Sequence, residues 1–215
     1  MTADIDLGDA LAHIAQALQV PVLIASILLL MACAIELGRF ATESYRRRRT
    51  ARGRLRAITA QVLAQPGLAR VVSGTAPSAI AAQAVRDLGI AATIGRPSAI
   101  EHALADYELA VQRRLDRTRL LVRGGPALGL MGTLIPLAPG LAALGRGDVA
   151  SLATNLRTAF GATVIGLLVG TVSFALTIVR TRAATEDLVA MERAVDDAEH
   201  ARATTTAAAA LETLA

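Results

Sequence analysis

Three long stretches almost free of charge stand out in the chain, and charged or breaker-rich segments separate them. They cover residues 17–37, 124–144 and 158–179, and Glu36 is the only charged residue within them. A helix of about 20 apolar residues crosses a hydrocarbon core of about 30 Å. The pattern therefore predicts an all-α integral membrane protein. The predicted transmembrane helices cover residues 17–38, 123–144 and 155–179.

Arginine is distributed unevenly around these runs. Eight arginines lie between Arg39 and Arg56, and Arg180 and Arg182 follow the third run. Loops rich in Lys and Arg stay on the cytoplasmic side. We therefore expect the N-terminus outside and the C-terminus inside. The segments expected outside the cytoplasm are 1–16 and 145–154, and those expected inside are 39–122 and 180–215.

The expected cytoplasmic segments read as helical. Residues 57–98 are rich in Ala and interrupted by Gly and Pro, which predicts short helices separated by turns. Behind them, apolar residues recur at helical spacing at positions 100, 104, 107, 111 and 115. Ser98 as N-cap and Glu101 as its partner fit the start of that helix. The second and third transmembrane helices are thus expected to extend into the cytoplasm.

Three further details concern helix ends. Pro21 is expected in the first turn of its helix, where a missing N–H costs little. The acidic segment 185–199 carries Leu188, Met191 and Val195 on one helical face, which predicts packing against the basic cytoplasmic helices. The Ala- and Thr-rich end, residues 203–215, is expected to be frayed.

Composition narrows the functional classes. The chain is 53% hydrophobic with a mean hydropathy of +0.49 and carries a net charge of +4. Cys33 is the single cysteine and lies inside an apolar run, so we expect a buried structural thiol. The sequence shows no metal-ligand cluster, nucleophile triad or phosphate-binding loop. We therefore expect neither an enzyme nor a bound metal or cofactor, and no nucleic-acid partner.

Glycines recur at four-residue spacing in the second and third runs. Small residues at this spacing let two membrane helices approach closely. This predicts that both helices pack against protein rather than lipid. The glycines assigned to helix packing are Gly125, Gly129, Gly132, Gly166 and Gly170.

Threonines give the two runs a polar side. Thr133 lies midway in the second run, and Thr163 and Thr177 flank Gly170 at seven-residue spacing in the third. A single membrane threonine usually bonds its own helix backbone. A stripe from two adjacent helices is better explained by a polar lumen or a polar partner. Because neither run contains a carboxylate, a proton carrier would have to come from a partner.

The segments PALGLMGTLIPL (126–137) and AFGATVIGLLVG (159–170) resemble the MotA/TolQ/ExbB proton channel family. That family typically shows a GLxGT pattern in its second membrane helix and an A-(T/G)-x-IGL pattern in its third. The resemblance covers about residues 100–182. The large insertion after the first transmembrane helix and the predicted topology agree with it.

The resemblance implies a homopentamer whose second and third helices line a lumen, with their glycine faces buried between subunits. Two copies of a single-span partner of the MotB/ExbD/TolR type would each supply a membrane aspartate. By position, Thr133 and Thr163 match the threonines that face this aspartate. Thr158 stands where TolQ and ExbB tend to carry a glutamate, five residues before the third-helix threonine, and we assign it to the ion pathway together with Thr133 and Thr163.

These observations lead to one functional hypothesis and one alternative. The hypothesis is a pentameric stator-like subunit of an ion-driven, most simply proton-driven, motor in a bacterial or archaeal cytoplasmic membrane. The alternative is a non-conducting membrane scaffold that assembles partner proteins through its glycine-rich helices.

Overall fold

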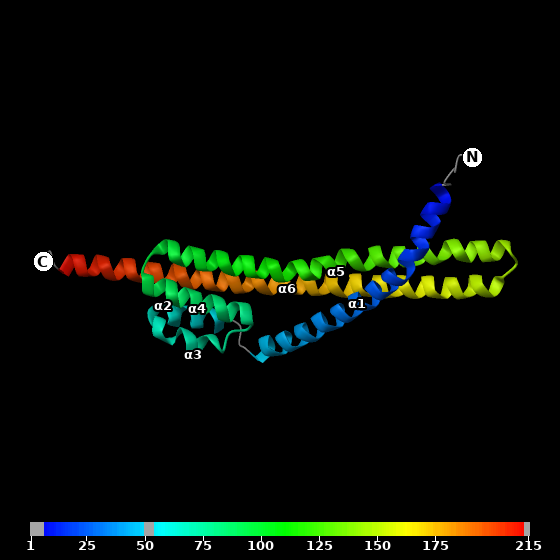
Figure 1. The fold of residues 1–215 in the computed structure, drawn as a ribbon. Coiled ribbons are helices and arrows are strands. Elements are labelled where there is room, and N and C mark those ends of the chain that lie inside the picture. Colours follow the sequence, from blue (N-terminus) through cyan, green and yellow to red (C-terminus); the bar gives the residue numbers. More distant parts are fainter. Residues whose placement is uncertain (1–6, 50–53, 213–215) are drawn as a thin grey trace. The chain divides into compact units, whose positions relative to one another are not determined.

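The structure, a computed structural model, describes residues 7–49 and 54–212, and every regular element in them is helical (Figure 1). The elements are α1 (Leu7–Arg49), α2 (Arg54–Ala64), the 3-10 helix η1 (Pro66–Leu68), α3 (Ala69–Ser73), α4 (Ala79–Ile94), α5 (Pro97–Gly145) and α6 (Val149–Glu212). In the described residues, three helices are long and apolar enough to cross a membrane, namely α1, α5 and α6. The prediction of an all-α protein with three such helices is confirmed.

The chain divides into two compact units, and each long helix contributes a segment to both. The described residues of the first unit are 7–38 and 116–177, which contain the three apolar runs. Those of the second unit are 39–49, 54–115 and 178–212, which contain the short helices.

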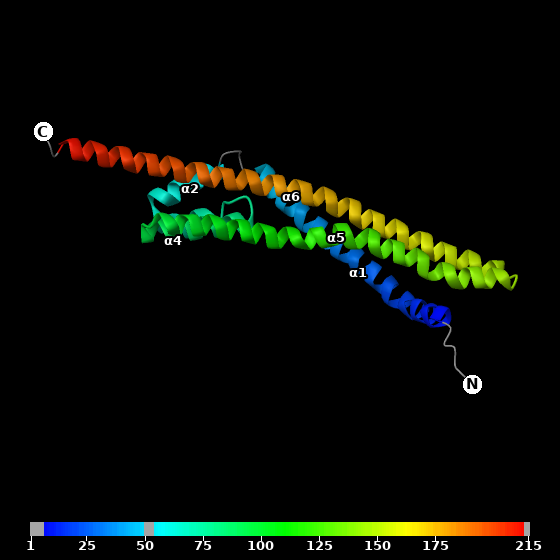
Figure 2. The same ribbon diagram turned by 90° about the horizontal axis from the view of Figure 1, so that it is seen from above.

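In the first unit, α5 and α6 form a hairpin and α1 crosses them (Figures 1 and 2). The turn is only three residues long, 146–148, so the stretch expected as a loop to residue 154 is helical from Val149. Gly147 adopts a left-handed conformation with φ of 80°. Asp148 accepts hydrogen bonds from the side chain and backbone N–H of Ser151, which lower the pKa of Asp148.

Helix α1 contacts the hairpin through a small apolar cluster. Its buried members are Cys33 from α1, Leu121 from α5 and Val169 from α6. The hydroxyl of Ser173 in α6 donates to the sulfur of Cys33 over 3.8 Å, and both residues are buried. Cys33 is therefore a buried packing residue, as the sequence predicted.

Proline positions differ in part from expectation. Pro126, Pro136 and Pro139 lie inside α5, as a membrane helix permits. The expectation for Pro21 is wrong, because α1 begins at Leu7 and Pro21 lies well inside it. A proline in a helix interior removes one backbone hydrogen bond, and α1 bends in its N-terminal half (Figures 1 and 2).

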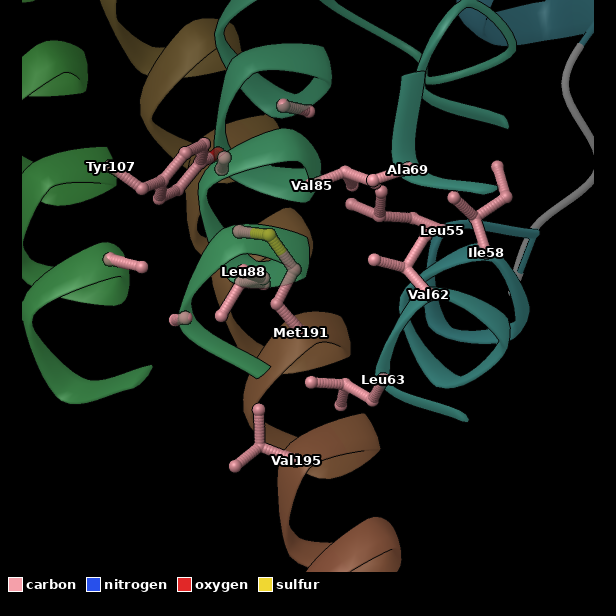
Figure 3. Packing of buried hydrophobic residues seen from close by; sticks show 14 of the residues in the cluster. Leu55, Ile58, Val62, Leu63, Ala69, Val85, Leu88, Tyr107, Met191 and Val195 are labelled. Carbon is pink, nitrogen blue, oxygen red and sulfur yellow. The ribbon is translucent and has the colours of Figure 1, made fainter. Parts of the chain in front are cut away.

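The second unit has its own hydrophobic core, to which α2, α3, α4, α5 and α6 contribute (Figure 3). Met191 and Val195 of α6 point toward Leu88 of α4 and Leu63 of α2, which confirms the predicted packing of the acidic segment. An added Cβ on Gly89 would lie 2.6 Å from the Cβ of Ala69. Only glycine at that position lets α4 come this close to α3.

Two expectations about helix ends are wrong. Helix α5 begins at Pro97, so Ser98 is its second residue rather than its N-cap. Proline is preorganised for the first helical position, which explains the earlier start. Residues 203–212 are helical rather than frayed, and residues 213–215 lie outside the described part of the chain. Alanine has the highest helix propensity, and this segment continues a helix that is already anchored in the core.

Candidate functional site

The contact between α5 and α6 in the first unit, here called the glycine seam, is made by backbone against backbone. A Cβ added to Gly125 would lie 2.6 Å from the carbonyl oxygen of Gly166, and one added to Gly166 would lie 2.5 Å from the oxygen of Gly125. Side-chain carbons do not approach oxygen this closely, so hydrogen is the only substituent that fits at either position.

The other three predicted packing glycines extend the seam. An added Cβ would lie 3.3 Å from the Cα of Gly166 for Gly129 and 2.5 Å from the Cβ of Ala162 for Gly132. For Gly170 it would lie 2.9 Å from the Cδ of Pro126. The structure thus places all five glycines between α5 and α6.

These contacts lie within one chain, so the expectation that the glycine faces meet between subunits is wrong for them. The reason is the short turn, which makes α5 and α6 neighbours along their length. Their glycine faces are already occupied by each other. A contact between subunits must use other faces of the two helices.

Thr133 and Thr163 lie on the side of the seam that is remote from α1. Ile165 packs against the α1 cluster, and Thr163, two residues earlier, lies about 200° around the helix from it. Gly124 faces Leu29 of α1, and Thr133, nine residues later, lies about 180° from Gly124. Both threonines are half-buried, so one edge of the hairpin presents them together.

Both hydroxyl groups donate to their own helix. Thr133 donates to the carbonyl of Leu130 over 2.7 Å, and Thr163 donates to that of Ala159 over 3.3 Å. The hydroxyl oxygens keep their lone pairs and can accept a hydrogen bond. To donate to another group, either hydroxyl must first rotate away from its backbone acceptor.

The structure separates Thr158 from the other two threonines. Thr158, Ile165 and Val172 follow each other at seven-residue spacing and therefore share a face of α6. Ile165 and Val172 pack against the α1 cluster, so this face is the one that turns toward α1. Thr158 donates to the carbonyl of Thr154 over 3.2 Å. Thr158 therefore lies on a different face of the hairpin from Thr133 and Thr163 and does not share a site with them.

The predicted stripe through Gly170 is also divided. Gly170 is buried against Pro126 of α5, whereas Thr163 and Thr177 are half-buried beside it. Gly170 therefore serves helix packing, and within this stripe only Thr163 and Thr177 offer hydroxyl groups.

Sequence reasoning missed an ion-pair cluster in the second unit. Arg47 of α1 binds Asp187 of α6 through both carboxylate oxygens, and the Asp187 side chain is 7% exposed. Arg114 of α5 binds Glu43 of α1 in the same two-pronged way. Glu43 and Arg47 lie one helical turn apart on α1. The acidic Glu43 binds α5, and the basic Arg47 binds α6.

The same cluster contains a buried tyrosine. Tyr107 of α5 is 4% exposed, and its hydroxyl donates to the carbonyl of Ala184 in α6 over 3.2 Å. Nothing in the sequence showed that the charged residues of the two ion pairs are buried rather than part of a solvated, arginine-rich flank. The only available signal was the four-residue spacing of Glu43 and Arg47, which places opposite charges on one helical face.

No cluster of three or more His, Cys, Asp or Glu side chains able to hold a metal ion occurs within residues 7–49 and 54–212.

Comparison with known proteins identifies one family. The model of the MotA/TolQ/ExbB proton channel family matches residues 75–194, which is more than half of the chain. The match includes α4, the whole of α5, the α5–α6 turn and most of α6. No curated protein and no solved structure matches the chain.

Proposed function

The chain belongs to the MotA/TolQ/ExbB proton channel family, and on this basis we propose that it is the stator-like subunit of a proton-driven membrane motor. It is a multi-pass membrane protein with three helices able to span the bilayer. The observation that carries the proposal is the shared edge on which Thr133 and Thr163 lie, remote from α1.

The chemistry of this edge requires a second protein. Residues 124–144 and 158–179 contain no carboxylate, so the proton carrier is proposed to be an aspartate of a single-span partner of the MotB/ExbD/TolR type. A carboxylic acid in an apolar site strongly prefers to be neutral. In its neutral form the acid can donate a hydrogen bond to the hydroxyl oxygen of Thr133 or Thr163. The hydroxyl protons of these threonines are already donated to the backbone carbonyls of their own helices.

Release of the proton is helped by rotation of the same hydroxyl groups. A hydroxyl that turns away from its backbone acceptor donates to the ionised carboxylate, a bond worth about 1–3 kcal/mol because one partner is charged. Each threonine therefore serves both protonation states of the aspartate. No catalytic group, metal or cofactor takes part in this proposal.

Assembly follows from the same edge. We propose five copies around two copies of the partner, with the Thr133–Thr163 edge toward the lumen and α1 toward lipid. The N-terminus is proposed outside and the arginine-rich segments in the cytoplasm of a bacterial or archaeal cell. Because the glycine seam is internal to each chain, each hairpin would enter the ring as a preformed pair of helices.

The experiment for this proposal is purification of the tagged chain from its native membrane, followed by native mass spectrometry. We expect five copies of the chain together with a single-span protein that carries an aspartate in its membrane segment. A complex without any such protein would contradict the motor and support the non-conducting scaffold. A stable monomer or dimer would contradict the ring.

A further inference from the structure

Large apolar side chains follow Thr163 along the edge of α6 that carries it. Phe174 lies eleven residues after Thr163, which places it only about 20° around the helix and about 17 Å farther along the axis. Leu167 comes four residues after Thr163 and lies about 40° around the helix from it. Phe174 is 56% exposed and Leu167 is 54% exposed, so both side chains project from the hairpin. They therefore belong to the edge that is proposed to face the lumen.

A further hydroxyl group lies beyond Phe174. Thr177 is half-buried, three residues after Phe174 and about 60° around the helix from it. Between the hydroxyl groups of Thr163 and Thr177, this edge carries Leu167, Gly170 and Phe174. Gly170 has no side chain, and phenylalanine is the largest residue of the three. Phe174 is thus the main apolar group that separates the two hydroxyl groups.

An ion pair lies on α5 at about the level of Phe174. A Cβ added to Gly125 would touch backbone atoms of α6 within residues 166–170. Since the two helices are antiparallel, Arg119, six residues before Gly125, lies at about the level of Phe174. The side chains of Arg119 and Asp116 pair over 3.3 Å, and both are more than half exposed. Charged groups at this level need water around them.

The ion pair and Phe174 share one edge of the hairpin. Arg119 lies fourteen residues before Thr133, which places it about 40° around α5 from that threonine. The edge therefore changes from charged to apolar near Phe174. On one side of Phe174 lies surface that requires water, and on the other lie the two threonines proposed to handle protons.

We propose that Phe174 is the inner barrier of the proton path. The inference rests on the proposed ring, in which five copies of Phe174 surround the two partner helices. An apolar constriction excludes water, so water on the cytoplasmic side does not reach Thr133 and Thr163. A proton then passes only when it is bound to the carboxylate of the partner. Without the barrier, water bonded to the threonine hydroxyl groups would connect them to the cytoplasm, and protons would leak.

Cysteine accessibility tests the barrier directly. In a Cys33→Ser background, Thr163→Cys and Thr177→Cys report whether water reaches each side of Phe174. A small charged thiol reagent is applied to inside-out membrane vesicles that contain the chain and its partner. We expect Thr177→Cys to react and Thr163→Cys to be protected. Adding Phe174→Ala should speed the reaction of Thr163→Cys several-fold, whereas Phe174→Leu, which keeps a large apolar side chain, should leave it protected.

The matched control is Leu168→Ala. It also removes a large, half-exposed side chain from α6, but Leu168 lies about 140° around the helix from Thr163. This change should leave the reactivity of Thr163→Cys as it is. Native mass spectrometry of each variant shows whether the complex with the partner is intact.

Proton leak gives a second readout. When the membrane aspartate of the partner is replaced, flux that depends on this carboxylate is absent. In that background, Phe174→Ala should let protons run down their gradient several-fold faster than the chain that retains Phe174. Leu168→Ala should not increase the leak.

Three outcomes would overturn the barrier. Rapid reaction of Thr163→Cys while Phe174 is in place would show water on both sides of it. Protection of Thr177→Cys would place the barrier nearer the cytoplasm. Unchanged accessibility and unchanged leak in Phe174→Ala would assign the exclusion of water to the partner helices. Failure of the proposed function is a different result, namely a natural complex without a partner or without flux, and it would contradict the ring and the barrier together.

Discussion

Gly166 of α6 lies so close to Gly125 of α5 that a Cβ atom on Gly166 would stand 2.5 Å from the carbonyl oxygen of Gly125. Membrane helices have little hydrophobic drive to associate, so contact of this kind supplies much of the attraction between them. The position of the proposed ion-path threonines depends on it, because the seam fixes which edge of the hairpin carries Thr133 and Thr163.

The first prediction concerns this seam. Gly166→Ala should force the two backbones apart and cost about 1–3 kcal/mol, the usual range for overpacking. Gly161→Ala is the matched control, because Gly161 is also helical and nothing lies within 4 Å of an added Cβ there. Thermal unfolding in detergent should show a lower midpoint for the first variant only. Equal midpoints for both would mean that the seam is looser than the structure shows.

The second prediction concerns the ion pair between Arg47 and Asp187. Asp187→Asn removes the charge that balances a partly buried guanidinium, and loss of one member of a buried pair costs about 3–5 kcal/mol. Asp196→Asn, an exposed change on the same helix, should have almost no effect. The measurement is the midpoint of thermal unfolding, read together with proteolysis of the second unit.

Exchanging the two charges tests whether Arg47 and Asp187 stabilise the fold by direct interaction with each other or independently. Arg47→Asp combined with Asp187→Arg should recover part of the stability that either single reversal loses. Strictly additive losses in the double variant would show that the two residues do not interact.

The third prediction concerns topology. In a Cys33→Ser background, His13→Cys should react with a membrane-impermeant thiol reagent in intact cells, and Gln61→Cys should react only after lysis. The arginines that follow the first apolar run provide the physical reason, since such segments remain in the cytoplasm. Labelling of Gln61→Cys in intact cells together with protection of His13→Cys would reverse the proposed orientation.

Much of the first unit could be predicted from the sequence, because length and uniform apolarity suffice to identify membrane helices. The same applies to the glycines, whose four-residue spacing in residues 125–129 and 166–170 predicts close helix contact. Spacing does not say whether the partner helix belongs to the same chain. The three-residue turn decides this, and its length is not evident from the residues between 145 and 154.

The second unit shows where reasoning from the sequence fails. Glu43 and Arg47 sit in a segment crowded with arginines, which reads as a solvated flank. Only their burial against Arg114 and Asp187 reveals an ion-pair cluster, and those partners are distant in the sequence. Thr158 illustrates the same limit, because its face is assigned by the contacts of α1 and not by its distance from Thr163.

The fourth prediction tests the central proposal, that Thr133 and Thr163 serve proton transfer to a partner carboxylate. Thr133→Val with Thr163→Val keeps the side-chain shape and removes both hydroxyl groups. Thr158→Val is the matched control, because Thr158 lies on the face turned toward α1. All variants should assemble normally with the partner, since the glycine seam is unchanged.

The most direct measurement is proton flux in proteoliposomes that contain the chain and its co-purified partner. We predict that the double threonine variant reduces flux at least tenfold, as expected when about 1.4 kcal/mol or more of stabilisation is lost in the rate-limiting transfer. Thr158→Val should conduct like the natural protein, and replacing the partner's membrane aspartate should abolish flux. Unchanged flux in the double variant would contradict the proposed role of the threonines, and absence of flux in the natural complex would contradict proton conduction itself.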